Sequence, residues 1–208
     1  MSDPTEQVLL RWRPEDLPTV IRDELRERTW PILTFYVALA GGVAWLLGLG
    51  YAAYQAEARL LVDAAVPFGA GVIAMILTVV PHELIHGLAY RITGARTVRY
   101  GAHLRQLMFH ASAPGHRLSV RALGFVALAP FLVLTPAIVA LATIGGIHWS
   151  FAACGLLLAH TQGCVGDFAM LSHLLRLRQR YGDLVSYDEP APDGGLGDFV
   201  VARVGARR

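Results

Sequence analysis

The sequence predicts an all-α membrane protein with four transmembrane helices and a short strand or β-hairpin in the loop between the second and third helices. Three observations predict this fold class. Hydrophobic residues make up 54% of the 208 residues, and charged residues only 16%. The apolar residues are gathered into four long runs, each close to the 20 residues that a helix needs to cross a hydrocarbon core. The basic residues are all arginine, and they lie almost entirely between alternate runs.

The four predicted transmembrane helices cover residues 31–54, 66–90, 122–147 and 149–175. The first carries no charge, and the second carries none before Glu83. Asp167 is the only residue of the fourth that is charged at neutral pH when histidine is counted as neutral. A soluble bundle needs helices with one polar face, and these runs have none to offer. We therefore expect the protein to be inserted in a membrane and to contact lipid directly.

The arginines predict the orientation of the helices in the membrane. Seventeen of the 18 lie before the first run, between the second and third, or after the fourth. Only Arg59 lies elsewhere, between the first and second runs. Positively charged loops stay on the cytoplasmic side of a membrane. The pattern thus predicts a multi-pass protein of the cell membrane with both termini in the cytoplasm.

The charged ends of the chain flank one membrane domain, predicted at residues 31–175. Residues 1–30 are expected to form a cytoplasmic amphipathic leader, because Pro14 precedes apolar residues at helical spacing. Residues 176–208 are expected to form an irregular cytoplasmic tail, because glycine, aspartate and proline are frequent there. A net charge of +2 gives no indication of a nucleic-acid partner. Nothing in the sequence predicts an oligomeric state.

The loop between the second and third runs shows a different pattern. Apolar and polar residues alternate over residues 98–104 and again over 107–111. A period of two residues is typical of a strand, so a short strand or hairpin is expected beside the membrane. An edge strand there would bind a peptide in extended form through main-chain hydrogen bonds.

The second run contains the motif His82-Glu83-Leu84-Ile85-His86. Residues four apart lie on one face of a helix, so His82 and His86 can direct imidazole nitrogens at a single ion with Glu83 beside it. This arrangement is typical of zinc hydrolases, in which the glutamate is the general base. Ionisable groups are costly inside a membrane helix, roughly 2.5–3.5 kcal/mol each, so a functional role is expected. The predicted cofactor is Zn²⁺, and the predicted catalytic residue is Glu83.

A zinc ion held by two histidines needs a third protein ligand and an open position for water. Asp167 is the leading candidate on depth. His82 lies 16 residues past Val66 and Asp167 lies 16 past Phe151, in helices that run in the same direction, so both are about 24 Å deep. His110 and His116, in the loop, are the rival candidates. His160 lies two helical turns before Asp167, roughly 10 Å along the helix axis, which is too far to bind the same ion.

Small residues in the fourth run predict its close contact with another helix. Gly155, Ala159 and Gly163 are four residues apart and form a small-residue face. The two cysteines, Cys154 and Cys164, are ten residues apart in the same predicted helix, and that spacing rules out a disulfide between them.

With His82-Glu83-Leu84-Ile85-His86 in one membrane helix and Gly166-Asp167-Phe168-Ala169-Met170 in a later one, the chain resembles the putative zincin peptidase family of small membrane proteins. That family is distantly similar to the site-2 protease class of intramembrane metalloproteases. The resemblance covers residues 67–187. It implies zinc held by His82, His86 and Asp167, Glu83 as the catalytic carboxylate, and hydrolysis of peptide bonds in or beside the bilayer.

The sequence thus predicts a zinc metallopeptidase that acts on a membrane-associated protein or peptide. The alternative is a protein without enzymatic activity, either a metal-binding membrane scaffold or a component of ion transport. Transport usually requires polar groups on several helices, and the first and third runs offer almost none. The sequence does not identify the substrate, the trigger or the group that stabilises the oxyanion.

Overall fold

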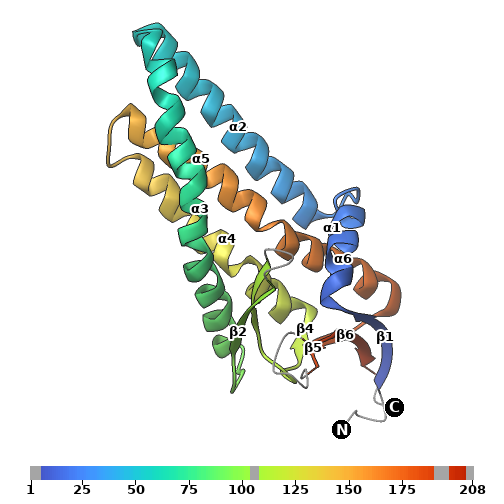
Figure 1. The fold of residues 1–208 in the computed structure, drawn as a ribbon. Helices are drawn as coiled ribbons and strands as arrows, with labels where there is room; N and C mark the ends of the chain where they lie inside the picture. The colour runs from blue at the N-terminus through green and yellow to red at the C-terminus, as the bar shows by residue number, and fades with distance from the viewer. Residues whose placement is uncertain (1–5, 104–107, 190–196, 205–208) are drawn as a thin grey trace. The chain divides into compact units, whose positions relative to one another are not determined.

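The computed structural model describes residues 6–103, 108–189 and 197–204, and most of these residues are helical (Figure 1). Three of the described helices are long and apolar enough to cross a membrane, as expected of a membrane protein. They are α2 (Trp30–Ala56), α3 (Arg59–Ile92) and α4 (Val120–Ala142). Each contains one of the first three predicted runs or most of it.

The fourth predicted helix is not one continuous helix. It consists of α5 (Ile147–Gly163) and α6 (Val165–Tyr181), which are separated at Cys164. Cys164 has φ −80° and ψ 0°, so the chain leaves the helical conformation at this residue. Glycines at positions 163 and 166 flank the break, and glycine is a poor helix former. Within the described residues, only α2, α3 and α4 qualify as membrane spans by length and hydropathy.

The two ends of the chain pair in a sheet that the sequence did not predict. Four antiparallel strands follow the order β1 (Glu6–Trp12), β6 (Phe199–Val204), β5 (Leu184–Asp188) and β4 (Leu118–Ser119). The expectation of an irregular tail after residue 176 was therefore wrong. Apolar side chains of β5 and β6 are buried, and this burial offsets the entropy of ordering two short strands.

The expected amphipathic leader is present in part. The short helices η1 (Pro14–Asp16) and α1 (Leu17–Glu24) follow β1. The predicted hairpin is confirmed as a separate two-stranded sheet of β2 (Arg99–His103) and β3 (Met108–Ser112). In its register Tyr100 is opposite Ala111, and Ala102 is opposite Phe109.

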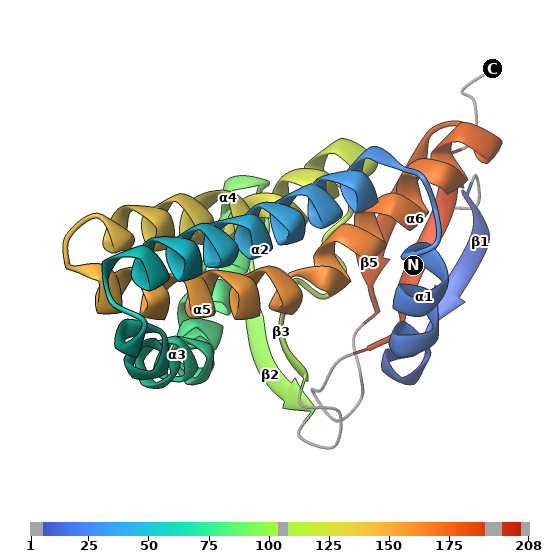
Figure 2. The same cartoon turned by 90° about the horizontal axis from the view of Figure 1, so that it is seen from above.

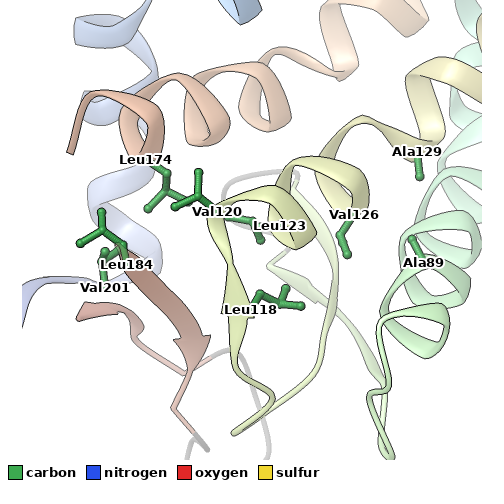
Figure 3. Packing of buried hydrophobic residues seen from close by; sticks show 9 residues of the cluster. All are labelled: Ala89, Leu118, Val120, Leu123, Val126, Ala129, Leu174, Leu184 and Val201. Carbon is green, nitrogen blue, oxygen red and sulfur yellow. The ribbon is translucent and has the colours of Figure 1, made fainter. Parts of the chain in front are cut away.

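The chain divides into two compact units, each described here by itself. One contains Met1–Ile32, Glu83–Ala129 and Gly166–Arg208, and the other contains Leu33–His82 and Pro130–Val165. The division falls within α3, between His82 and Glu83. The first unit has an apolar core that joins its helices to the four-stranded sheet (Figure 3). The buried residues of this core are Ala89, Leu118, Val120, Leu123, Val126, Ala129, Leu174, Leu184 and Val201.

In the second unit, α5 packs closely against the first half of α3. A Cβ atom added to Gly71 would overlap the carbonyl oxygen of Ala152 and lie 2.7 Å from its carbonyl carbon. One added to Gly155 would overlap the carbonyl oxygen of Phe68. The predicted small-residue face of α5 is therefore a contact between two backbones. In the views of Figures 1 and 2, α2 also runs beside α5, and the Cys154 thiol donates to the Gly42 carbonyl at 3.6 Å.

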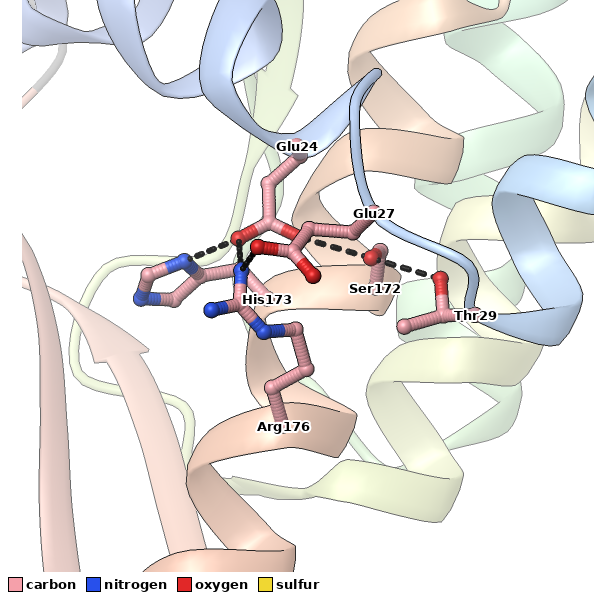
Figure 4. Close-up of polar contacts among 6 residues, drawn as sticks. All are labelled: Glu24, Glu27, Thr29, Ser172, His173 and Arg176. Atoms are coloured by element: carbon pink, nitrogen blue, oxygen red, sulfur yellow. Dashed lines mark hydrogen bonds and ion pairs between the residues drawn. The ribbon is translucent and has the colours of Figure 1, made fainter.

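A buried carboxylate joins α1 to α6 in the first unit (Figure 4). Glu24 is 2% exposed and accepts hydrogen bonds from Ser172 at 2.6 Å and from His173 and Arg176 at 2.7 and 2.8 Å. Burial alone would raise the pKa of Glu24, but the bonds from His173 and Ser172 and the charges of His173 and Arg176 outweigh it, so the pKa is lowered. No pattern in the sequence pointed to this cluster, because Glu24 lies about 150 positions from its partners in α6.

Candidate metal centre

Helix α3 positions the HExxH residues. The motif lies near the end of a 34-residue helix in which His82 and His86 are one turn apart and each 8% exposed, while Glu83 is half-buried. Pro81 precedes the motif without ending the helix. A continuous helix thus places both imidazoles on one face, as the spacing predicted.

Asp167 is presented by the first turn of α6. Because the break at Cys164 starts a new helix, Asp167 lies at an N-terminus, where the helix dipole stabilises a carboxylate. Its Oδ1 is 3.3 Å from Nε2 of His86. Both residues belong to the same unit of the chain. The structure therefore brings the sequence-predicted aspartate to the second histidine of the motif.

A backbone carbonyl determines which nitrogen of His86 faces Asp167. Nδ1 of His86 lies 2.9 Å from the carbonyl oxygen of Val126 in α4, and that oxygen can only accept, so Nδ1 must donate. In a regular helix the Val126 carbonyl would accept from the residue four positions later, but that residue is Pro130, which has no N–H. The proline therefore leaves the carbonyl available to orient the imidazole.

This hydrogen bond makes the pair of His86 and Asp167 suitable for a cation. With the proton on Nδ1, Nε2 of a neutral imidazole carries a lone pair, and the carboxylate oxygen facing it at 3.3 Å carries lone pairs as well. Two acceptors at this distance require a proton or a metal ion between them. Donation of the second ring nitrogen to a carbonyl is the usual arrangement of a metal-binding histidine.

The third member of the predicted ligand set is adjacent. His82, His86 and Asp167 each offer one ligand atom, and these atoms lie within 4.8 Å of one another. Two imidazoles and one carboxylate are a donor set typical of zinc in hydrolases. The rival candidates His110 and His116 belong to no such group among the described residues. His116 instead contacts the Thr93 hydroxyl through Nε2 at 3.2 Å.

A second group of metal-binding residue types contains His82, His160 and Cys164, whose ligand atoms also lie within 4.8 Å of one another. From the sequence, His160 was expected to lie too far from Asp167 to bind the same ion. His160 and Asp167 share no group among the described residues, but the imidazole rings of His82 and His160 have centroids 5.9 Å apart, a contact that the sequence did not predict. The signal that could have found this group is the spacing of His160 and Cys164, which are four residues apart at the end of α5.

The β2–β3 hairpin contacts α3 one residue after the motif. A Cβ atom added to Gly87 would overlap the Tyr100 hydroxyl and lie 2.7 Å from the ring carbon that bears it. Glycine at this position therefore lets the tyrosine of β2 reach the helix. Since residues 83 and 87 are four apart, the tyrosine meets α3 one turn beyond Glu83.

These features define a helical membrane protein with paired histidines and a carboxylate gathered around an HExxH turn. A model of the putative zincin peptidase family matches residues 75–181, which include the motif, the hairpin and Asp167. The match covers just over half of the chain, and the protein belongs to this family. No curated protein and no solved structure matches the chain.

Proposed function

We propose that this protein is a zinc-dependent metallopeptidase that hydrolyses peptide bonds of membrane-associated protein substrates within or near the bilayer. The observation that carries the proposal is the pairing of His86 Nε2 with Asp167 Oδ1 at 3.3 Å, beside a glutamate on the same apolar helix. Membership of a zincin peptidase family supports peptide hydrolysis as the reaction.

The donor set is suited to a catalytic zinc ion. His82, His86 and Asp167 would hold the metal, and three protein ligands leave one position open. A bound zinc ion would supply Lewis acidity, which polarises a scissile carbonyl and acidifies a water molecule. The charges of Asp167 and Glu83 balance that of a divalent cation, and this balance lowers the cost of placing the ion in an apolar helix.

Glu83 would carry protons during the reaction. It follows His82 directly, so its side chain lies about 100° around the helix from that ligand. It is half-buried and thus accessible from one side. In this position the carboxylate would accept a proton from the attacking water and pass it to the leaving amine. Asp167, by contrast, would stay ionised as a metal ligand and would not carry protons.

The hairpin would present the substrate. Tyr100 and Phe109 are 53% and 44% exposed, and the register places them on one face of the two-stranded sheet. Among the described residues, β2 and β3 pair only with each other, so each keeps an unpaired edge. Strand addition to such an edge would hold a peptide extended, and an extended backbone exposes the carbonyl that a helix shields.

The arginine pattern supports a cell-membrane location with both termini in the cytoplasm. This topology requires an even number of crossings, and α2, α3 and α4 supply three. Helix α5, with 17 residues, is about 26 Å long and would return the chain to the cytoplasmic side. Reporter fusions at the two ends test this topology, because it predicts cytoplasmic reporter activity at both.

The decisive experiment compares wild type with Glu83→Gln in membranes of the producing cells. Zinc content should be retained in Glu83→Gln, while new protein N-termini detected by mass spectrometry in wild type should disappear. Glu57→Gln, at an exposed position, is the matched control and should leave both unchanged. Zinc binding without any Glu83-dependent cleavage would instead favour the metal-binding scaffold or the ion-transport component.

A further inference from the structure

The end of α5 carries a second pair of metal-binding side chains at helical spacing. His160 and Cys164 are four residues apart, both are fully buried, and the Cys164 sulfur lies 3.7 Å from Nε2 of His160. The backbone N–H of Cys164 also bonds the His160 carbonyl at 3.1 Å. The helix end therefore holds the imidazole and the thiol on one face.

His82 of α3 faces this pair within the same unit of the chain. The rings of His82 and His160 meet edge to face, with an angle of 71° between their planes. The close approach of α3 and α5 keeps them there, because Gly71 and Gly155 bring the two backbones into contact. The three side chains thus come from two helices whose separation cannot easily change.

The chemistry of these three side chains differs from that of the HExxH set. Two imidazoles and one thiolate bind zinc well, and the soft sulfur also favours cobalt and other thiophilic ions over magnesium or calcium. Binding requires the thiolate, so the thiol would release its proton to solvent as the sulfur–metal bond forms. Neither Glu83 nor Asp167 belongs to this group.

We propose that His82, His160 and Cys164 form a second metal-binding set that competes with the set of His82, His86 and Asp167 for one ion. The competition arises because His82 belongs to both sets. An ion on the thiolate set is withdrawn from Asp167, so the protein then holds its metal in a latent position. Metal binding by the thiolate set stands by itself, whereas latency rests on the proposed peptidase function.

Cobalt titration of the metal-free, full-length protein in detergent tests the proposal. A thiolate ligand gives Co²⁺ a charge-transfer absorption in the near ultraviolet, which nitrogen and oxygen ligands do not give. We expect this band in wild type and at least twofold greater intensity in Asp167→Ala, where the competing set is disabled. Cys164→Ser should abolish the band. Cys154→Ser is the matched control, since Cys154 is also a fully buried cysteine but lies within α5, and it should leave the band unchanged.

Alkylation of wild type provides a measurement that does not depend on the folding of variants. Added Zn²⁺ should slow the modification of Cys164 at least tenfold relative to that of Cys154, as read by mass spectrometry of the two peptides. Equal effects on both cysteines would overturn the proposal.

The possible results separate this proposal from the proposed function. Bound cobalt without a charge-transfer band, lost on Asp167→Ala, would overturn the thiolate set and leave the HExxH centre standing. A band that depends on Cys164, in a protein without Glu83-dependent cleavage, would support the thiolate set and overturn the peptidase. The absence of any cobalt binding would overturn both.

Discussion

Substitution of Gly87 by alanine should disturb the contact between the HExxH helix and the hairpin. The added Cβ would overlap the Tyr100 hydroxyl and lie 2.7 Å from the ring carbon beneath it, about 0.7 Å short of an ordinary contact at 3.4 Å. Overpacking of this size costs about 1–3 kcal/mol, because either the ring or the hairpin must move. Alanine also gains about 1 kcal/mol over glycine in a helix, which partly hides this cost.

Gly69→Ala is the matched control, because Gly69 lies in the same helix and an added Cβ there has no neighbour within 4 Å. The gain in helix propensity is common to both variants, so their difference isolates the overlap with Tyr100. We expect Gly87→Ala to be less stable than Gly69→Ala by about 1–3 kcal/mol, or roughly 2–12 °C in apparent melting temperature in detergent. If the hairpin presents substrate, cleavage should also fall in Gly87→Ala alone.

A second substitution tests the cause of the loss. Tyr100→Ala removes the atoms that the new Cβ would meet, so the double variant Gly87→Ala/Tyr100→Ala should be no less stable than Tyr100→Ala alone. Equal melting temperatures for Gly87→Ala and Gly69→Ala would refute the reasoning, since they would show that the hairpin does not rest on the helix at this residue.

Three further changes have defined outcomes. Glu24→Gln should cost about 1–3 kcal/mol of stability at neutral pH, because buried donors lose their charged acceptor. Since the pKa of Glu24 is lowered in the folded protein, this contribution should persist as the pH falls to 4.5, the usual pKa of a glutamate, and disappear below it. Melting curves recorded across pH measure this loss. Burial raises the pKa of Asp188 from 3.8 to about 6, against the opposing effect of a bond from the Ala113 N–H, so native stability should fall as pH rises through that interval. Asp188→Asn should therefore stabilise the protein by up to about 3 kcal/mol at pH 8 and by nothing at pH 3. Pro130→Ala restores an N–H that competes for the Val126 carbonyl and should weaken zinc affinity by up to about tenfold in competition titrations, whereas the control Pro136→Ala, in the same helix, should not.

His82 belongs to both groups of side chains that could hold a metal ion. It is the first histidine of the HExxH motif and also the partner of His160 and Cys164. Loss of His82 should therefore abolish both modes of metal binding, whereas loss of Asp167 or Cys164 should abolish only one. This asymmetry follows because His82 is the one residue that both groups share.

The sequence by itself determined the features that depend on local geometry. Long apolar runs imply membrane helices because each residue adds a fixed rise, and α2, α3 and α4 follow the first three runs. The spacing of His82 and His86 implies a shared face for the same reason. The depth argument for Asp167 assumed one continuous fourth helix, whereas the structure pairs Asp167 with His86 from the first turn of α6.

Only the tertiary structure decided the features that depend on partners distant in sequence. The strands β1 and β6 pair across nearly the whole chain, and neither short segment shows which partner it will take. Pro130 leaves the Val126 carbonyl without its helical donor, but nothing in the sequence shows that His86 binds that carbonyl. The end of α5 at Gly163 was not predicted either, and it places Asp167 in the first turn of a new helix rather than within a continuous one. Local sequence specifies the shape of each segment, whereas the contacts between segments depend on packing that no single segment contains.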